Sequence, residues 1–164
     1  MPTSPLQLQI RPVEASNLSD LIRLAEETNL SPWTHDDLLA ELRTPEGILL
    51  KLVSSENEFL GFIVGRTVPG SVGNEDPDGE IYNIAVVPAR QRGGLGQVLL
   101  DAFLDECRSR SAVNVWLEVR ESNLKAAKFY EKNGFRYIQV RHNFYRNPPE
   151  HALLMQLILK NETA

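Results

Sequence analysis

The segment Val87–Leu100, VPARQRGGLGQVLL, decides the fold, because it joins an apolar run to an amphipathic helix through a turn of unusual composition. Two arginines, a glutamine and three glycines crowd together in this turn. Glycine is unfavourable in regular structure, and positive side chains beside a helix start oppose the helix dipole. The composition therefore indicates that something negative binds at this turn.

A phosphate fits this description, because a helix N-terminus presents free N–H groups and a partial positive charge. Gly93, Gly94 and Gly96 would let the phosphate approach the backbone, and the neighbouring Arg90, Gln91 and Arg92 would add donors. The alternative is a glycine-rich turn with solvated arginines. The segment lacks the Gly-Lys-Ser/Thr of a P-loop and the third glycine of a dinucleotide-binding turn, so neither of these common nucleotide sites is expected.

Outward from the turn, the hydrophobic spacing switches repeatedly between the periods of strands and helices. Strands are expected at 8–11, 48–53, 59–68, 80–87, 113–119, 135–140 and 152–159, and helices at 34–42, 94–110 and 122–133. A further helix is expected to start at a cap formed by Ser16 or Asn17 and to be broken by Pro32-Trp33. This pattern predicts a single α/β domain over residues 1–164, with a mixed, twisted sheet of about seven strands and helices on both faces. The central strands 80–87 and 113–119 are expected to be splayed, and the tail 160–164 to be frayed.

The composition limits the classes of function. The chain has 164 residues, of which 42% are hydrophobic, and a net charge of −5, which argues against direct binding of nucleic acid. A single cysteine, Cys107, excludes an internal disulfide. No signal peptide and no apolar run of about 20 residues is evident, so a cytoplasmic protein without a membrane anchor is expected.

The turn and its surroundings resemble a known family. Gln91-Arg92-Gly93-Gly94-Leu95-Gly96 fits the Gln/Arg-x-x-Gly-x-Gly motif with which GNAT N-acetyltransferases bind the pyrophosphate of acetyl-CoA. The segment 82–88 resembles the strand that precedes this motif in the family. The segments 116–120, 122–123 and 129–135 resemble one branch, the ribosomal protein alanine N-acetyltransferases, as do Pro32-Trp33 and the segment 141–145. Archaeal and eukaryotic N-terminal acetyltransferases share much of this pattern.

The resemblance implies that acetyl-CoA is the co-substrate and that a set of residues contacts it. These residues are the strand backbone at Ile84, Ala85 and Val86, the turn residues Gln91, Arg92, Gly93, Gly94, Leu95, Gly96 and Gln97, and Asn123, which would otherwise cap a helix.

Acetyl transfer to an amine needs a base, and Glu118 is the first candidate. It lies on an otherwise apolar strand, where an unpaired charge is unfavourable, and it matches the acid that the branch uses as its base. An edge position paired with Arg120 or another arginine is the structural alternative. Glu80, at the start of the other central strand, is the alternative base.

Tyr130 is the candidate acid, since helical spacing turns its ring inward and a phenol can protonate a departing thiolate. A core tyrosine is the alternative. Cys107 falls on an apolar helix stripe, so direct transfer without an acetyl-enzyme is expected. His35, His142 and His151 lack the spacing of metal ligands, and no metal is expected.

The resemblance implies the N-terminal alanine of a basic, small-subunit ribosomal protein as the acceptor. Trp33, Tyr82, Arg141 and Tyr145 would bind this substrate, and acidic residues in the long loop 69–79 would attract it. The protein would act as a monomer or weak dimer. Acetylation of a small amine or a lysine side chain, or a non-catalytic acetyl-CoA-binding module, are the alternatives.

Overall fold

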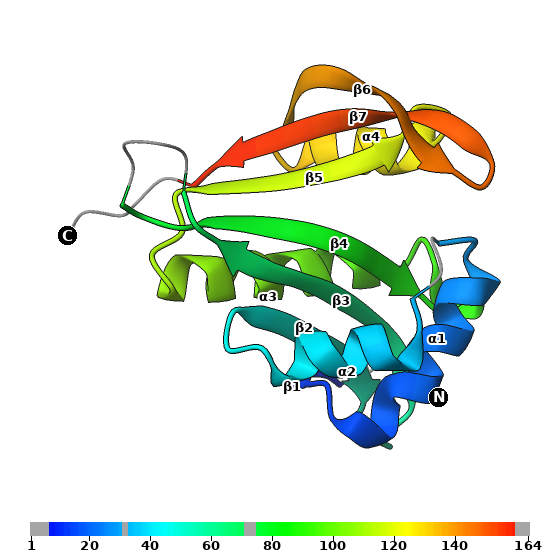
Figure 1. Ribbon diagram of the computed structural model, residues 1–164. Helices are drawn as coiled ribbons and strands as arrows, with labels where there is room; N and C mark the ends of the chain where they lie inside the picture. The colour runs from blue at the N-terminus through cyan, green and yellow to red at the C-terminus, as the bar shows by residue number, and fades with distance from the viewer. Residues whose placement is uncertain (1–6, 31–32, 71–74, 160–164) are drawn as a thin grey trace. The chain divides into compact units, whose positions relative to one another are not determined.

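The computed structural model describes residues 7–30, 33–70 and 75–159. The strands are β1 (Leu8–Pro12), β2 (Gly47–Ser54), β3 (Phe59–Val68), β4 (Asp78–Val86), β5 (Asn114–Arg120), β6 (Arg136–Arg146) and β7 (Pro149–Ile158); the α-helices are α1 (Leu18–Glu27), α2 (His35–Arg43), α3 (Leu95–Ser109) and α4 (Leu124–Lys132). Short 3-10 helices lie at Ala15–Asn17 and Pro88–Arg90. These elements are labelled in Figure 1.

The strands form one seven-stranded sheet with the order β1-β2-β3-β4-β5-β7-β6. β4 and β5 are parallel, whereas β1–β2, β2–β3, β5–β7 and β6–β7 are antiparallel. The predicted α/β class with a mixed, seven-stranded sheet is therefore confirmed. The chain divides into two compact units, residues 1–66 with 83–106 and residues 67–82 with 107–164.

The first unit contains β1, β2, β3, the end of β4 and most of α3. Long buried runs in β2 and β3 show that both faces of these strands are covered. In Figure 1, α1 and α2 lie over one face and α3 lies behind the other, as predicted for helices on both faces. The buried side of α1 consists of Leu18, Leu21, Leu24 and Ala25.

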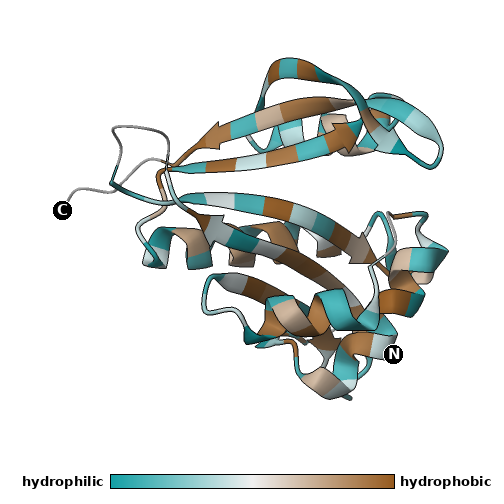
Figure 2. Ribbon diagram, in the orientation of Figure 1, coloured by the Kyte–Doolittle hydropathy of each residue, from teal (hydrophilic) through white to brown (hydrophobic). Residues whose placement is uncertain are grey.

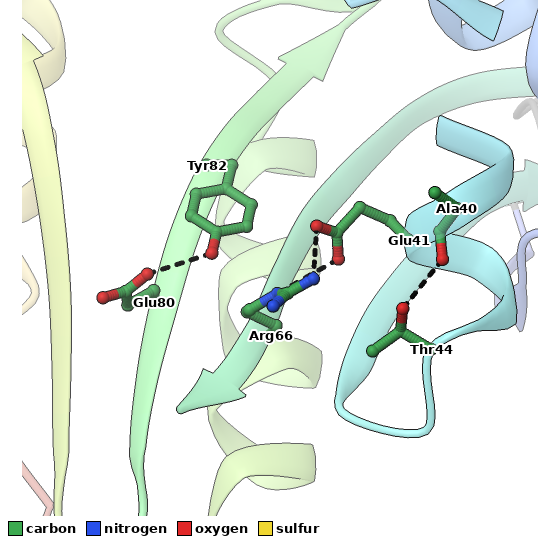
Figure 3. A network of polar contacts seen from close by, with 6 residues as sticks. All are labelled: Ala40, Glu41, Thr44, Arg66, Glu80 and Tyr82. Carbon is green, nitrogen blue, oxygen red and sulfur yellow. Dashed lines mark hydrogen bonds and ion pairs between the residues drawn. The ribbon is translucent and has the colours of Figure 1, made fainter. Parts of the chain in front are cut away.

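Local signals in this unit are partly as expected. Thr34 caps α2 in a capping box with Asp37, as its position in the sequence predicts. Asn17 occupies the N-cap position of α1 but does not cap it with its side chain. Instead, its Oδ1 accepts hydrogen bonds from the Glu14 backbone N–H and from Lys51 Nζ, at 2.9 and 2.8 Å. α2 is also held by a bidentate ion pair between Glu41 and Arg66 of β3 (Figure 3).

The second unit is a smaller sheet with α4 on one face. Side chains of β5 alternate strictly between buried and half-buried. Figure 2 shows the corresponding alternation of hydrophobic and more hydrophilic residues along this strand. α4 covers the buried face of this sheet. Gly134 follows the end of α4, and a Cβ at this residue would lie 3.3 Å from the side chain of Leu157. Leu157 of β7 pairs with the buried Val115 of β5, so the two side chains lie on the same face. Gly134 has φ of +91° and ends the helix in the left-handed conformation, as predicted.

The structure corrects the expected C-terminal strands. A polar loop was expected between strands 135–140 and 152–159, but β6 continues to Arg146 and β7 begins at Pro149. Polar residues can occupy β6 because it is an edge strand and is exposed over most of its length. Pro149 is compatible with the first position of a strand. β4 likewise begins two residues earlier than expected, at Asp78.

Three expectations concern residues outside the described ranges: the frayed tail 160–164, Pro32, and residues 71–74 of the long loop. The single domain over residues 1–164 and the splaying of the two central strands stay predictions. In residues 7–30, 33–70 and 75–159, no helix is both long and apolar enough to cross a membrane.

Gly61→Ala is expected to destabilise the protein strongly. A Cβ at this position of β3 would lie 2.6 Å from the backbone oxygen of Ala85 in β4 and 3.1 Å from Leu99 of α3, so the backbone must shift. Such overpacking costs about 1–3 kcal/mol of the free energy of unfolding, measurable by urea denaturation. Gly93→Ala is the control, because its Cβ would meet only the Arg90 backbone oxygen, at 3.4 Å. Equal stability of the two variants would contradict this prediction.

Candidate active site

The turn after β4 exposes its backbone. Arg92 and Gly94 both have positive φ, at +69° and +80°. A Cβ on Gly94 would meet no atom within 4 Å, and Gly93 is exposed as well. α3 begins directly afterwards at Leu95, so its first N–H groups follow this open backbone. A ligand of the size and charge of a phosphate group therefore has access to the donors of the turn.

Two side chains hold the turn in place. Gln91 Nε2 donates to the carbonyl oxygen of Val86, at the end of β4, over 3.1 Å. Arg90 pairs with Glu58, with Nη2 and Oε2 3.7 Å apart. The first contact joins the turn to β4 and the second joins it to the connection between β2 and β3, both in the same unit, whereas Arg92 is exposed. The sequence suggests Gln91 as a hydrogen-bond donor to a bound anion. In the structure its side chain also forms a hydrogen bond within the protein, which was not predicted.

The other predicted cofactor residues fall around the same elements. Ile84, Ala85 and Val86 close β4, and Leu95, Gly96 and Gln97 form the first turn of α3, where Gln97 Nε2 donates to Asp101. Asn123 belongs to the second unit. It caps α4, accepting the Ala126 N–H at 3.2 Å, which is the structural alternative given for it above.

β5 presents the candidate base on its polar face. Glu118 alternates with the buried Leu117 and Val119, and 25% of its side chain is exposed. Its Oε1 accepts a hydrogen bond from Arg141 Nη1 of β6 at 3.0 Å. The arginine partner suggested by the sequence therefore exists, but it is Arg141 rather than Arg120.

The environment of Glu118 favours proton uptake. Burial raises the pKa of its carboxyl above the ordinary 4.5, the positive charge of Arg141 opposes this rise, and the negative charge of Glu80 adds to it. A carboxylate with a raised pKa binds a proton more readily than an exposed one does. This property matches the task of a base.

Glu80, the alternative base, lies on the same face of the sheet. It pairs with Trp116 in the ladder between β4 and β5, two residues before Glu118. Tyr82, the next residue along that face of β4, donates its hydroxyl to Glu80 Oε2 at 3.0 Å (Figure 3). Glu80 thus accepts a hydrogen bond from Tyr82, and its negative charge raises the pKa of Glu118.

Tyr130 comes from the opposite side of β5. It is buried in α4, against Phe129 and Phe135, with ring centroids 5.3 and 5.4 Å away. Burial raises the pKa of its hydroxyl far above the ordinary 10, and Tyr145 raises it further. The phenol therefore stays protonated at neutral pH.

Tyr145 connects the polar face to the β6–β7 hairpin. Burial and the charge of Glu118 raise the pKa of Tyr145 to about 12. The guanidinium of Arg120 lies 4.2 Å from the centre of its ring and donates to the carbonyls of Asn147 and Pro148, at 3.1 and 3.0 Å. Arg120 therefore anchors this end of the hairpin to β5.

The structure corrects the expectation for Asp78, which the sequence places with the acidic residues of the loop 69–79 that would attract a basic substrate: it is the first residue of β4 and is buried. This carboxylate is 4% exposed and accepts hydrogen bonds from Asn114 Nδ2 and Trp116 Nε1, both at 3.0 Å. Gln156 of β7 extends the network by donating to Asn114 over 2.9 Å. Asn114 and Trp116, which carry hydrogen-bond donors at alternate positions of β5, were the sequence signal that could have indicated a buried acceptor nearby. The network fixes the start of β4 beside β5, two residues before Glu80.

The structure thus brings Glu80, Tyr82, Glu118, Arg141 and Tyr145 together on one face of the second unit. Trp33 and the glycine turn belong to the first unit. Trp33 is half-buried and directly precedes the capped start of α2. Within the residues that the structure describes, no cluster of three histidine, cysteine or acidic side chains is arranged to hold a metal ion.

The mixed seven-stranded sheet, the open glycine turn of the first unit and the half-buried carboxylate of the second unit are each compatible with an acyltransferase of the α/β class. In agreement, the Acetyltransferase (GNAT) family profile matches residues 17–135, and the chain belongs to this family.

Named relatives cover nearly the whole chain. The ribosomal protein bS18-alanine N-acetyltransferase of Escherichia coli K12 is 42% identical over 150 residues, covering 90% of this chain and 95% of the relative. The protein of the same name from Haemophilus influenzae is 31% identical over 157 residues, with coverage of 92% and 98%. The crystal structure of the ribosomal-protein-S18-alanine N-acetyltransferase from E. coli superposes with a TM-score of 0.79 at 26% identity, covering 96% and 99% of the two chains.

Gly94→Asn is expected to preserve the fold and to weaken binding of coenzyme A. Asparagine tolerates the left-handed conformation, and the site has room for its Cβ, but the new side chain would cover the turn. The dissociation constant measured by calorimetry should rise at least about tenfold. The melting temperature should move by less than about 3 °C.

Gly94→Val is the comparison, since a β-branched residue strains a left-handed backbone and should lower both affinity and stability. Unchanged affinity in Gly94→Asn would show that the ligand does not contact this turn.

Proposed function

We propose that the protein transfers an acetyl group from acetyl-CoA to the N-terminal amine of a protein, namely the N-terminal alanine of a small-subunit ribosomal protein. The observation that carries this proposal is Glu118, a half-buried carboxylate with a raised pKa on the polar face of β5. The names of the relatives in E. coli and H. influenzae support alanine as the acceptor.

The residues of the glycine turn fit the diphosphate of acetyl-CoA. Gly93 and Gly94 carry no side chain, the backbone at Gly94 is open, and a 15-residue helix starts at the next position. Arg92 adds a permanent positive charge. Ile84 to Val86 and Gln91 to Gln97 would hold the co-substrate, together with Asn123. When bound, acetyl-CoA supplies an activated acetyl thioester.

Glu118 would prepare the acceptor. The α-amino group of a peptide has a pKa of about 7.7–8.0, so at neutral pH most of it carries an extra proton. The carboxylate takes this proton and leaves the nitrogen lone pair free to attack. Tyr130, which holds its phenolic proton because it is buried, donates that proton to the departing thiolate.

Other features complete the proposal. Cys107 is fully buried, so direct transfer is favoured over an acetyl-cysteine intermediate. Trp33, Tyr82, Arg141 and Tyr145 would contact the acceptor peptide. We place the protein in the cytoplasm, acting on a basic protein partner as a monomer or weak dimer, without a metal and without direct contacts to nucleic acid or membrane.

The acceptor is tested by incubating the protein with acetyl-CoA and peptides, followed by mass spectrometry. A peptide beginning with alanine should gain one acetyl group at its α-amine. A peptide with a blocked N-terminus and a free lysine, and small amines such as spermidine, should gain none. Acetylation of the lysine would favour the alternative acceptor class. Release of no free thiol with any amine would leave only a non-catalytic acetyl-CoA-binding role.

Glu118→Gln is expected to lower kcat by about 10²–10⁴, the usual contribution of a positioned base. Coenzyme A affinity should stay within about twofold, because the substitution is nearly isosteric. Tyr130→Phe should lower kcat without changing this affinity. Glu121→Gln, an exposed neighbour, is the matched control. If Glu80→Gln, rather than Glu118→Gln, abolishes turnover, Glu80 is the base.

The pH dependence of kcat/KM should show a limb on the acid side that belongs to Glu118. The protonated carboxyl cannot accept a proton, so activity falls as the pH drops through its pKa, which burial places above 4.5. No limb from Tyr130 is expected below about pH 10. An acid limb that persists unchanged in the residual activity of Glu118→Gln would contradict the assignment.

A further inference from the structure

Two arginines lie on the polar face near Glu118, and they have different partners. Arg120 directs its guanidinium to the carbonyls of Asn147 and Pro148 and over the ring of Tyr145. Arg141 instead donates from Nη1 to Glu118 Oε1 at 3.0 Å. Of the two, only Arg141 is an ion-pair partner of Glu118.

The backbone around Arg141 is fixed by an irregularity of β6. Arg141 pairs with Ala152 of β7, and the register then shifts before Tyr145 pairs with Glu150, so three residues of β6 face His151 alone. Asn143 has φ of +54° and donates its backbone N–H to His151 Nδ1 at 2.9 Å. The bulge therefore starts immediately after Arg141, which is held in the ladder at a defined position.

The contact with Arg141 engages only one oxygen of the carboxylate. In the part of the chain that the structure describes, Oε2 of Glu118 has no hydrogen-bond partner. The charged or titratable groups that face Glu118 are Glu80 on β4, which carries the hydroxyl of Tyr82, and Arg141 and Tyr145 on β6. Arg120 also lies on this face of β5, but its guanidinium is engaged by Tyr145, Asn147 and Pro148, so Arg141 is the cation that contacts Glu118.

We propose that Arg141 is a positioning residue for the base: it binds Oε1, holds Glu118 in the carboxylate form against the charge of Glu80, and leaves Oε2 for the acceptor amine. This inference rests on the proposed function, in which Glu118 is the base. It gives Arg141 a role different from the direct substrate contact that the sequence resemblance implies.

The chemistry requires a cation of this kind. In the step, a proton leaves the ammonium nitrogen and bonds to Oε2, the nitrogen regains its lone pair, and the carboxylate becomes a neutral acid that later releases the proton to water. The guanidinium of Arg141 does not protonate the carboxylate in place of the substrate ammonium, because arginine does not lose its proton in proteins. Arg141 can therefore stay paired through Oε1 without competing as a proton donor.

The test is Arg141→Met, with Arg141→Lys and Arg136→Met as comparisons. Methionine keeps the length of the side chain and removes the charge, lysine keeps the charge, and Arg136 is an exposed arginine of the same strand. With the alanine peptide, kcat/KM of Arg141→Met should fall about 3- to 10-fold at pH 6 and by less than about twofold at pH 9. Lysine should restore most of the loss, and Arg136→Met should match the wild type.

A second measurement reads the carboxyl directly. The protein is labelled with ¹³C-glutamate, and the Glu118 side-chain carbon is assigned by its disappearance in Glu118→Gln and titrated by NMR without ligands. The titration midpoint should move to higher pH in Arg141→Met and remain in place in Arg136→Met. This readout does not depend on turnover.

Two outcomes overturn the inference by itself: an unmoved midpoint, or a loss in Arg141→Met that is equal at pH 6 and pH 9 and is confined to KM. The latter is the behaviour of a direct substrate contact. Normal turnover in Glu118→Gln would instead overturn the proposed base, and the inference with it. The two failures are thus distinguished by whether Glu118→Gln retains activity.

Discussion

The strict alternation of side chains along β5 is the constraint on which the second unit depends. Val115, Leu117 and Val119 face α4 and are buried, whereas the residues between them face the polar side. A shift of one residue in the register would place Glu118 beneath α4 as a buried charge without partners, which is strongly unfavourable. Packing of the apolar face thereby determines where the carboxylate lies.

This alternation separates the two groups to which the proposal assigns proton transfer. Glu118 belongs to the polar face, and Tyr130 is delivered by the helix on the apolar face. Burial raises the pKa of both groups, but with different effects. It gives the carboxylate a stronger affinity for a proton, and it keeps the phenol protonated at neutral pH. In the proposed mechanism the carboxylate is therefore the proton acceptor, and the phenol enters the reaction in its protonated form.

Much of this arrangement could be predicted from the sequence, because it depends on local signals. Periodicity identifies the strands and helices, the glycines mark the turn, and a lone acid on an apolar strand identifies Glu118. The partners of Glu118 could not be predicted in the same way. Arg141 is 23 residues away, and it reaches the carboxylate only because β6 extends to Arg146, through a segment whose polar composition suggested a loop.

The burial of Asp78 could not be predicted for a related reason. It stands at the end of an acidic, glycine- and proline-containing stretch that reads as solvated, and its burial depends on donors from Asn114 and Trp116, 36 and 38 residues further along. The chain has two tryptophans, Trp33 and Trp116. Since the indole N–H of Trp116 is bonded to a carboxylate at the start of β4, its fluorescence is an intrinsic probe of how β4 and β5 pair. A protein in which Trp33 is phenylalanine would report on that contact alone, without any external label.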